Sequence, residues 1–195
     1  MRLTILDGGS CEAGECFVDT GSTFTLAVDV REAPASPYVL VQTFIEYGVY
    51  DPTASEDEAG PDTCGDGIDN GDEDGVDRRD EDCVIVDLVY VPSDAAQDEV
   101  VWEDLSPDTA LRGNIGPGTV LHGGLTGLIP PLPESNATGV VVQFQLTCPA
   151  DPVAVPVSLL VYEDALANTS GSVFVEADGD TKVVPDVAPV TVNCE

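Results

Sequence analysis

The chain has 195 residues, of which 43% are hydrophobic, enough for one domain with a substantial core and too many for a wholly disordered protein. It carries 37 acidic and 6 basic residues, a formal net charge of −31 at pH 7. Such a surface repels phosphates and anionic lipid headgroups, which argues against nucleic acid partners and membrane insertion, and it attracts divalent cations.

Nearly every apolar segment predicts a β-strand. Residues 24–30, FTLAVDV, alternate apolar and polar side chains with the period of a half-buried strand. The same assignment follows for 38–50, 84–91, 139–148, 153–163, 171–177 and 187–194. Turn-forming Pro, Gly, Asn and Asp separate these segments at the short spacing of an antiparallel sandwich. The prediction is an all-β protein, a single antiparallel β-sandwich domain over residues 1–195.

Three segments depart from this pattern. Residues 106–113, SPDTALRG, could form a short helix after a serine cap. Residues 113–135 are rich in Gly and Pro and are interpreted as a long connection partly packed on the sandwich. Pro156 lies inside a strand-like run, so we expect that strand to lie at a sheet edge or to break there.

The six cysteines predict disulfides, because their number is even and no Cys-x-x-Cys zinc pattern is present. Proximity suggests the pairs Cys11–Cys16, Cys64–Cys83 and Cys148–Cys194, although other connectivities stay open. Disulfides indicate an oxidising compartment, and the glycosylation sequons at Asn136 and Asn168 are compatible with export. The opening residues lack the apolar run of a secretory signal, so we expect an exported form to obtain its signal elsewhere.

Two pairs of segments resemble cohesin domains. VDTGSTFTLAVDV followed by YVLVQTFIEYGVYDPTA is similar to the opening of that family, including the Tyr50-Asp51-Pro52 element, and GVVVQFQLTC followed by VPVSLLVYEDAL is similar to a later strand pair. The resemblance implies a jelly-roll or cohesin-like sandwich. Cohesins bind dockerin modules through one sheet face, so it also implies a protein partner, without assigning contact residues. The insertion at 56–83, the disulfides and the Gly/Pro-rich segment are departures from the basic pattern.

The insertion at 56–83 predicts a calcium site. It holds 13 acidic residues and 2 arginines, and their repulsion would keep it open without a counter-ion. Aligning Gly75 with the glycine of an EF-hand loop places candidate ligands at positions 1, 3, 5, 7 and 12 of that loop. In order, these are Asn70, Asp72, Asp74, the carbonyl of Val76, and Glu81. Position 1 is normally Asp, and flanking helices are not evident, so a calcium loop closed by Cys64–Cys83 is favoured over a full EF-hand.

The same stretch resembles a DGIDNDGDG calcium loop of bacterial surface proteins, with one residue more here. That resemblance implies five further candidate ligands and room for two ions: Asp66, Asp69, Asp77, Asp80 and Asp82. The alternative interpretation is a solvated, disordered acidic insertion. Ordinary acidic linkers lack this glycine spacing and the bracketing cysteines, which favours a structural Ca²⁺.

Catalytic motifs are weak, and we expect no enzyme. His122 is the only histidine, and without a Gly-x-Ser-x-Gly elbow a packing role is favoured over a Ser–His–Asp triad. Trp102 is assigned to the core rather than to a sugar-binding platform.

The predicted function is a non-catalytic, calcium-stabilised module at the cell surface or outside the cell, binding another protein. One alternative is a structural subunit of a filament, pilus or surface layer, in which copies of the chain assemble through strand or calcium contacts. A second alternative is a carbohydrate-binding module with a glycan ligand.

Overall fold

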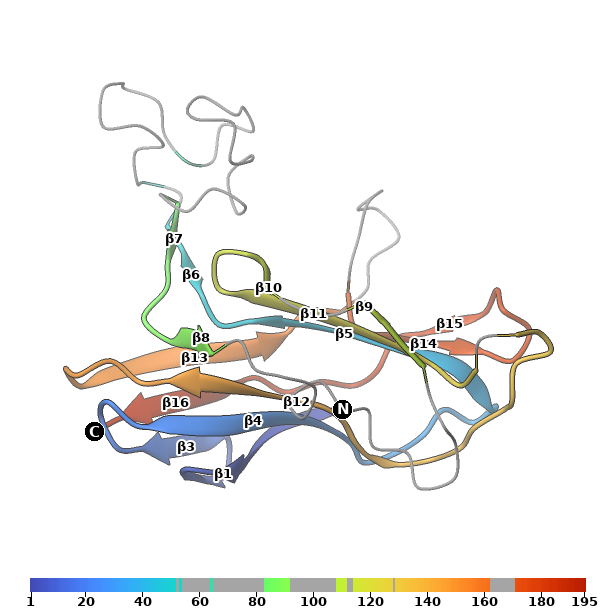
Figure 1. Cartoon of the computed structure of the whole chain (residues 1–195), viewed down its shortest axis with the longest axis horizontal. Coiled ribbons are helices and arrows are strands. Elements are labelled where there is room, and N and C mark those ends of the chain that lie inside the picture. The colour runs from blue at the N-terminus through green and yellow to red at the C-terminus, as the bar shows by residue number, and fades with distance from the viewer. Residues whose placement is uncertain are drawn as a thin grey trace.

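The computed structural model of the chain describes residues 1–51, 53, 64, 83–91, 108–111, 114–127, 129–161 and 171–195. Regular structure in these residues is β-strand, arranged as two stacked layers with a narrow projection at one end (Figure 1). Among them, no helix has the length and apolar character needed to cross a bilayer. The predicted all-β sandwich is confirmed.

The first layer is a four-stranded antiparallel sheet. Its order is β1 (Arg2–Asp7), β4 (Thr23–Val30), β12 (Gly139–Thr147) and β8 (Val89–Val91). On the inner side, three cross-strand pairs of β4 and β12 are buried: Phe24–Leu146, Leu26–Phe144 and Val28–Val142. Each such side chain contributes about 1.5–3 kcal/mol on burial.

The second layer is larger and branched. Its main path is β10 (Asn114–Gly116), β11 (Thr119–Leu125), β5 (Tyr38–Glu46), β13 (Val153–Leu159), β16 (Val190–Cys194), β3 (Glu15–Val18) and β2 (Ser10–Glu12). Three short strands branch from it: β9 (Asp108–Leu111) on β11, and β14 (Val173–Glu176) on β5 with β15 (Lys182–Val183) beyond. The β3–β16 ladder is parallel. Its inner side adds Val41, Ile45, Val155, Val157 and Val192 to the same core.

A two-stranded ribbon, β6 (Val49–Tyr50) paired with β7 (Val84–Ile85), forms the projection. The predicted strands 38–50 and 84–91 each divide into two, because the chain leaves the sandwich for this ribbon. We call this ribbon the stalk. Strands β1, β2, β3 and β15 lie outside the segments predicted as strands.

Two sequence predictions are wrong. Residues 108–111 form strand β9 rather than a helix, and 119–125, within the predicted long connection, form the strand β11. In both cases the backbone is held by a ladder: β9 pairs with β11, and β11 pairs with β5 over seven residues. These partners are distant in sequence, and their hydrogen bonds outweigh the low strand propensity of Gly123 and Gly124.

At Pro156, strand β13 is hydrogen-bonded to a neighbouring strand on one side only. At this residue the ladder runs to Thr191 of β16, whereas the ladder to β5 begins at Ser158. Proline lacks the N–H that a second ladder would need, so the expected edge position is found locally in an otherwise internal strand.

The three disulfides join the pairs expected from proximity. Cys11–Cys16 closes the β2–β3 hairpin, where these residues face one another. Cys148–Cys194 ties the end of β12 in one layer to the end of β16 in the other, across a sequence separation of 46. Cys64–Cys83 has a separation of 19 and lies at the stalk.

Removing the inter-layer disulfide should destabilise the domain more than removing the hairpin disulfide. Loop-closure entropy gives about 4 kcal/mol for the pair Cys148→Ala/Cys194→Ala and about 2 kcal/mol for Cys11→Ala/Cys16→Ala. Urea denaturation of both double variants measures the difference. Equal losses would contradict the assignment of Cys148–Cys194 as the main constraint between the layers.

Candidate functional site

The outer face of the first layer is mostly polar on β4 and β12, whereas Val89 of β8, opposite Thr147, is 60% exposed. On β4 and β12 the outward pairs are Thr23–Thr147, whose hydroxyl oxygens lie 2.8 Å apart, and Thr25–Gln145. At the far end of β4 the Asp29 carboxylate lies 2.6 Å from Arg31 Nε and 3.9 Å from an Arg2 guanidinium nitrogen. The two hydroxyl groups pair with one another and Asp29 pairs with the arginines, so this part of the face offers little to an apolar partner.

The outer face of the second layer carries apolar side chains on either side of Gln42, with Glu46 at one end of β5. Val41 and Ile45 of β5 point into the core, so the intervening residues of this strand point outward. The register places Phe44 opposite Leu121, and Leu40 between Leu125 and Val175. All five side chains are half-buried. We call this set, Leu40, Phe44, Leu121, Leu125 and Val175, the apolar face.

Hydrogen bonds hold the apolar face in place from its β14 side. Gln42 Nε2 donates to the Gly171 carbonyl at 2.8 Å, and the Phe44 N–H donates to Ser172 Oγ at 3.1 Å. Gly123, between Leu121 and Leu125 on β11, is buried, although no atom of the described residues would lie within 4 Å of a β-carbon placed on it. The hydrogen bonds to β14 therefore fix the strand that carries Leu40 and Phe44.

The single histidine lies beneath this face, not on it. His122 is 1% exposed and sits opposite Thr43 on the core side of the β5–β11 ladder. The packing interpretation agrees with this position, although its segment is a strand rather than a loop.

The stalk rises from the same pair of strands. The backbones of Gly48 and Gly118 are in contact: a β-carbon on Gly118, whose φ is +62°, would lie 2.5 Å from the Gly48 Cα. Gly118 also accepts hydrogen bonds from the N–H groups of Tyr47 and Gly48, at 2.7 and 3.1 Å. This close approach redirects the chain out of the sandwich after β5.

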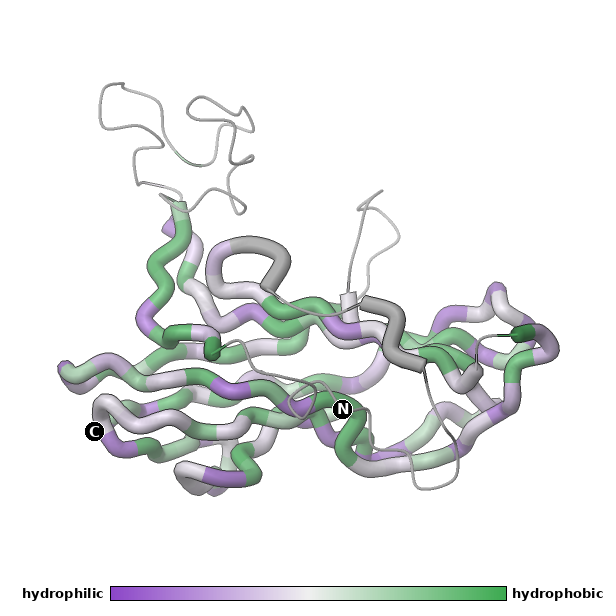
Figure 2. Tube along the Cα trace, in the orientation of Figure 1, coloured by the Kyte–Doolittle hydropathy of each residue, from purple (hydrophilic) through white to green (hydrophobic). Residues whose placement is uncertain are grey.

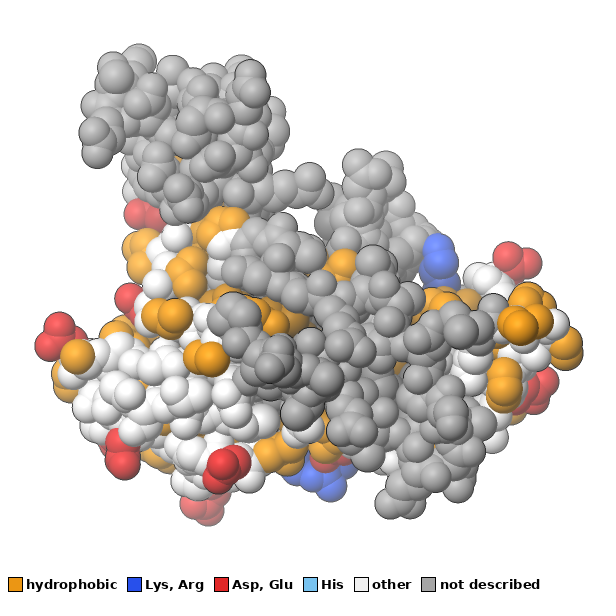
Figure 3. All heavy atoms as spheres, viewed as in Figure 1, with side chains coloured by type: hydrophobic (Ala, Val, Ile, Leu, Met, Phe, Trp, Pro, Cys, Tyr) orange, Lys and Arg blue, Asp and Glu red, His pale blue; other side chains and the backbone are white. Residues whose placement is uncertain are grey.

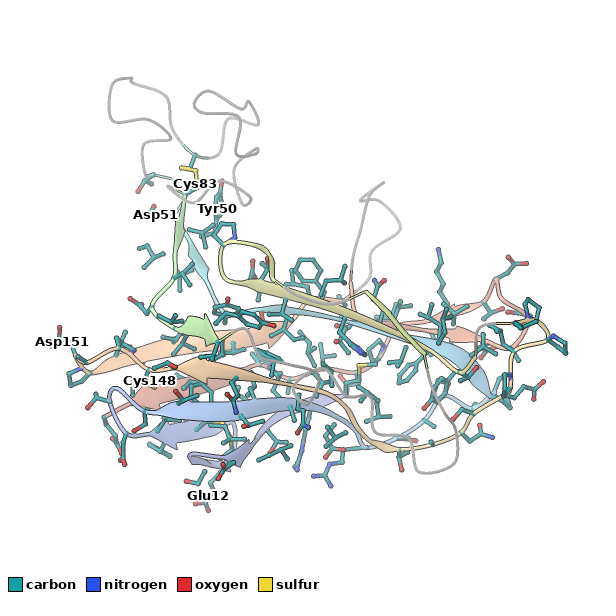
Figure 4. All side chains as sticks on the ribbon, in the orientation of Figure 1. Glu12, Tyr50, Asp51, Cys83, Cys148 and Asp151 are labelled. Atoms are coloured by element: carbon teal, nitrogen blue, oxygen red, sulfur yellow. A yellow bond between two sulfur atoms is a disulfide. The ribbon has the colours of Figure 1, made fainter. Side chains whose placement is uncertain are left out.

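Residues at the upper end of the stalk adjoin the two ends of the acidic insertion. The Asp51 N–H donates to the Cys83 carbonyl at 2.9 Å, and Asp51 Oδ1 accepts from the N–H of Thr53 at 2.9 Å. Cys64 and Cys83 are fully buried around their disulfide, with Val84 and Tyr50 packed against them (Figure 4). The two ends of the insertion are thus held together by the ribbon and by a covalent link.

The ten predicted calcium ligands lie outside the described residues: Asp66, Asp69, Asn70, Asp72, Asp74, Val76, Asp77, Asp80, Glu81 and Asp82. Trp102 and the sequon at Asn168 also lie outside them. Asn136 is exposed, next to Ser135, which bridges to Tyr38. Within the part of the chain that is described, no group of three or more His, Cys, Asp or Glu residues is arranged to hold a metal ion.

Sequence reasoning did not identify the apolar face. Its signal was present in 38–46, YVLVQTFIE, where both alternate sets of positions contain apolar residues. A strand apolar on both sides is typical of one that is covered on both faces.

No protein-family model and no curated protein matches the chain. Solved structures that share its fold include two from Acetivibrio cellulolyticus. The sixth cohesin of scaffoldin B, crystallised in complex with a mutant Cel5 dockerin, has a TM-score of 0.53 and 12% identity over 100% of this chain and 96% of that one. The type II cohesin dyad of the adaptor ScaA scaffoldin has a TM-score of 0.52 and 10% identity over 100% of this chain and 48% of the dyad. The chain has a cohesin-like β-sandwich fold.

Tyr47, between β5 and the stalk, should make the fold sensitive to alkali. Burial, with a smaller effect of the Tyr90 phenol, raises the pKa of Tyr47 to about 12. Because this pKa is higher in the folded than in the unfolded chain, its stabilisation is complete below pH 10 and is lost as the pH rises towards 12. Relative to Tyr47→Phe, the native chain should lose about 1 kcal/mol of unfolding free energy between pH 8 and pH 11. Urea denaturation of both proteins at the two pH values tests this, and parallel losses would contradict it.

Proposed function

We propose that this chain is a non-catalytic protein-interaction module that binds a protein partner through the apolar face of β5, β11 and β14. The observation that carries the proposal is the contrast between the two outer faces of one cohesin-like sandwich. The face on β4 and β12 presents mainly Thr, Gln and Asp, whereas the opposite face presents Phe44 and four aliphatic side chains around Gln42. Contiguous surface of that kind is typical of interaction sites.

The fold and its neighbours support a protein rather than a small-molecule partner. The structural neighbour in scaffoldin B is a cohesin in complex with a dockerin, a protein module. The apolar face is an extended sheet surface held at both its β11 and β14 sides, and such surfaces match the area of protein interfaces better than the enclosed shape of ligand pockets.

We further propose an extracellular or cell-surface location. Three disulfides in a chain without free cysteines among the described residues suit an oxidising compartment. The exposed sequon at Asn136 and the strongly acidic surface are compatible with that location.

We propose that Ca²⁺ orders the acidic insertion. Carboxylate, amide and carbonyl oxygens are the donors that this ion takes, about six to eight at a time. The ribbon and Cys64–Cys83 hold the ends of the segment together, which lowers the entropy cost of gathering its ligands around an ion. Because the ion would bind the folded arrangement, it would stabilise that arrangement without taking part in catalysis.

Substitution on the apolar face should weaken partner binding. The immobilised protein is used to retain partners from the extracellular fraction of its own organism, and the retained protein is identified and its affinity measured. Leu121→Asp should weaken that binding at least tenfold, because a carboxylate there must be desolvated against apolar surface.

Thr25→Asp is the matched control, since it places the same charge on the outer face of an internal strand in the other layer. Thermal melts establish that both variants are folded. Equal retention by Leu121→Asp and the native chain, or equal loss in both variants, would overturn the assignment of the face.

Calcium should raise the melting temperature, and the rise should shrink in Asp72→Ala and Asp74→Ala. Differential scanning calorimetry in millimolar Ca²⁺ and in excess chelator measures the shift. Asp178→Ala, an acidic residue in the exposed turn between β14 and β15, provides the control. An unchanged melt on chelation would count against a calcium ion in the insertion.

A further inference from the structure

The two faces of the stalk differ. Tyr50 and Val84 lie opposite one another on one face and pack with the Cys64–Cys83 disulfide. On the other face, Val49 and Ile85 lie opposite one another and are 39% and 54% exposed, and the adjoining Val86 is 38% exposed. We call Val49, Ile85 and Val86 the stalk patch. Apolar side chains gather at the base of the stalk (Figure 3), and its tube is coloured largely as hydrophobic (Figure 2).

The stalk is also small as a sheet. In the described residues β6 pairs with β7 alone. A ribbon of two strands is marginal by itself, and an extended segment laid over the stalk patch would cover its β-branched side chains. An extended segment of another chain meets this need.

The acidic residues near the stalk favour a docked segment that carries basic side chains. In the described residues between 38 and 91 there is no lysine or arginine, whereas Glu46, Asp51 and Asp87 lie near the stalk in sequence. The insertion that the stalk bears has 13 acidic residues and 2 arginines, a net charge of −11. The described cations, Arg2, Arg31 and Lys182, belong to or adjoin β1, β4 and β15, and the basic side chains visible in Figure 3 lie away from the stalk.

We propose that the stalk patch docks an extended segment of a protein partner in which apolar side chains alternate with lysine or arginine. This inference rests on the proposed function in one respect, that the segment belongs to a protein partner. The apolar side chains cover Val49 and Ile85, while the cations face the acidic surroundings. A second copy of the chain is disfavoured as the occupant, because each copy carries a net charge of −31 and the same acidic insertion at 56–83.

Calorimetric titration of the intact chain with acetyl-Lys-Val-Lys-Ile-Lys-Val-Lys-amide tests the proposal. The double variant Val49→Thr/Ile85→Thr keeps β-branched side chains and the net charge, so the stalk should still form while its apolar surface is lost. It should bind the peptide at least tenfold more weakly than the native chain. Val184→Thr changes another exposed valine, 47% exposed and next to β15, and should bind with native affinity.

Several results would overturn the proposal. Equal affinity of the native chain and the double variant would show unspecific attraction of a cation to an acidic protein. Equal affinity for a peptide with Ser in place of Val and Ile would show the same. A dimer of the native chain in sedimentation velocity, lost in the double variant, would identify a second copy as the occupant. Because Leu121→Asp alters the apolar face and leaves the stalk patch intact, failure of partner retention is distinguishable from failure of peptide docking.

Discussion

The ladder between β5 and β11 is the constraint on which the rest of the structure depends. Its register, from Thr119 opposite Glu46 to Leu125 opposite Leu40, directs Val120 and His122 inward and Leu121 and Leu125 outward. A slip of one residue would exchange these sets, burying the leucines and turning the histidine to the surface. The same ladder ends at the Gly48–Gly118 contact, from which the stalk departs. The core, the apolar face and the position of the insertion are thus consequences of one strand pairing.

The molecule separates its charge from its apolar surface. The sandwich keeps its core through close-packed Val, Leu and Phe pairs and through a disulfide that joins the two layers. The most acidic segment of the sequence, 56–83, is joined to the sandwich through the β6–β7 ribbon and carries its own disulfide.

Similarity to cohesins lies in the fold and not in shared residues. The neighbour in scaffoldin B has a TM-score of 0.53 to this chain, yet only 12% of the aligned residues are identical. A fold of this kind hosts many functions, so the function must be argued from the surfaces that this chain presents. Those surfaces are the apolar face, built on β5, β11 and β14, and the stalk patch, built on β6 and β7.

Local sequence by itself predicted the all-β class, the strands β4, β5, β12, β13, β14 and β16, and the cysteine pairs, and it supplies the proposed calcium ligands. Period-two alternation, close cysteine spacing and the Asp/Gly pattern can each be recognised within a short segment, such as 24–30 or the residues around Gly75. Tertiary structure alone decided that 108–111 and 119–125 are strands, because their hydrogen-bond partners are other segments of the chain and their own composition favours turns or a helix. It also decided the apolar face. Both alternate sets of positions in β5 contain apolar residues, and only the pairing with β11 and the opposing layer selects which set enters the core.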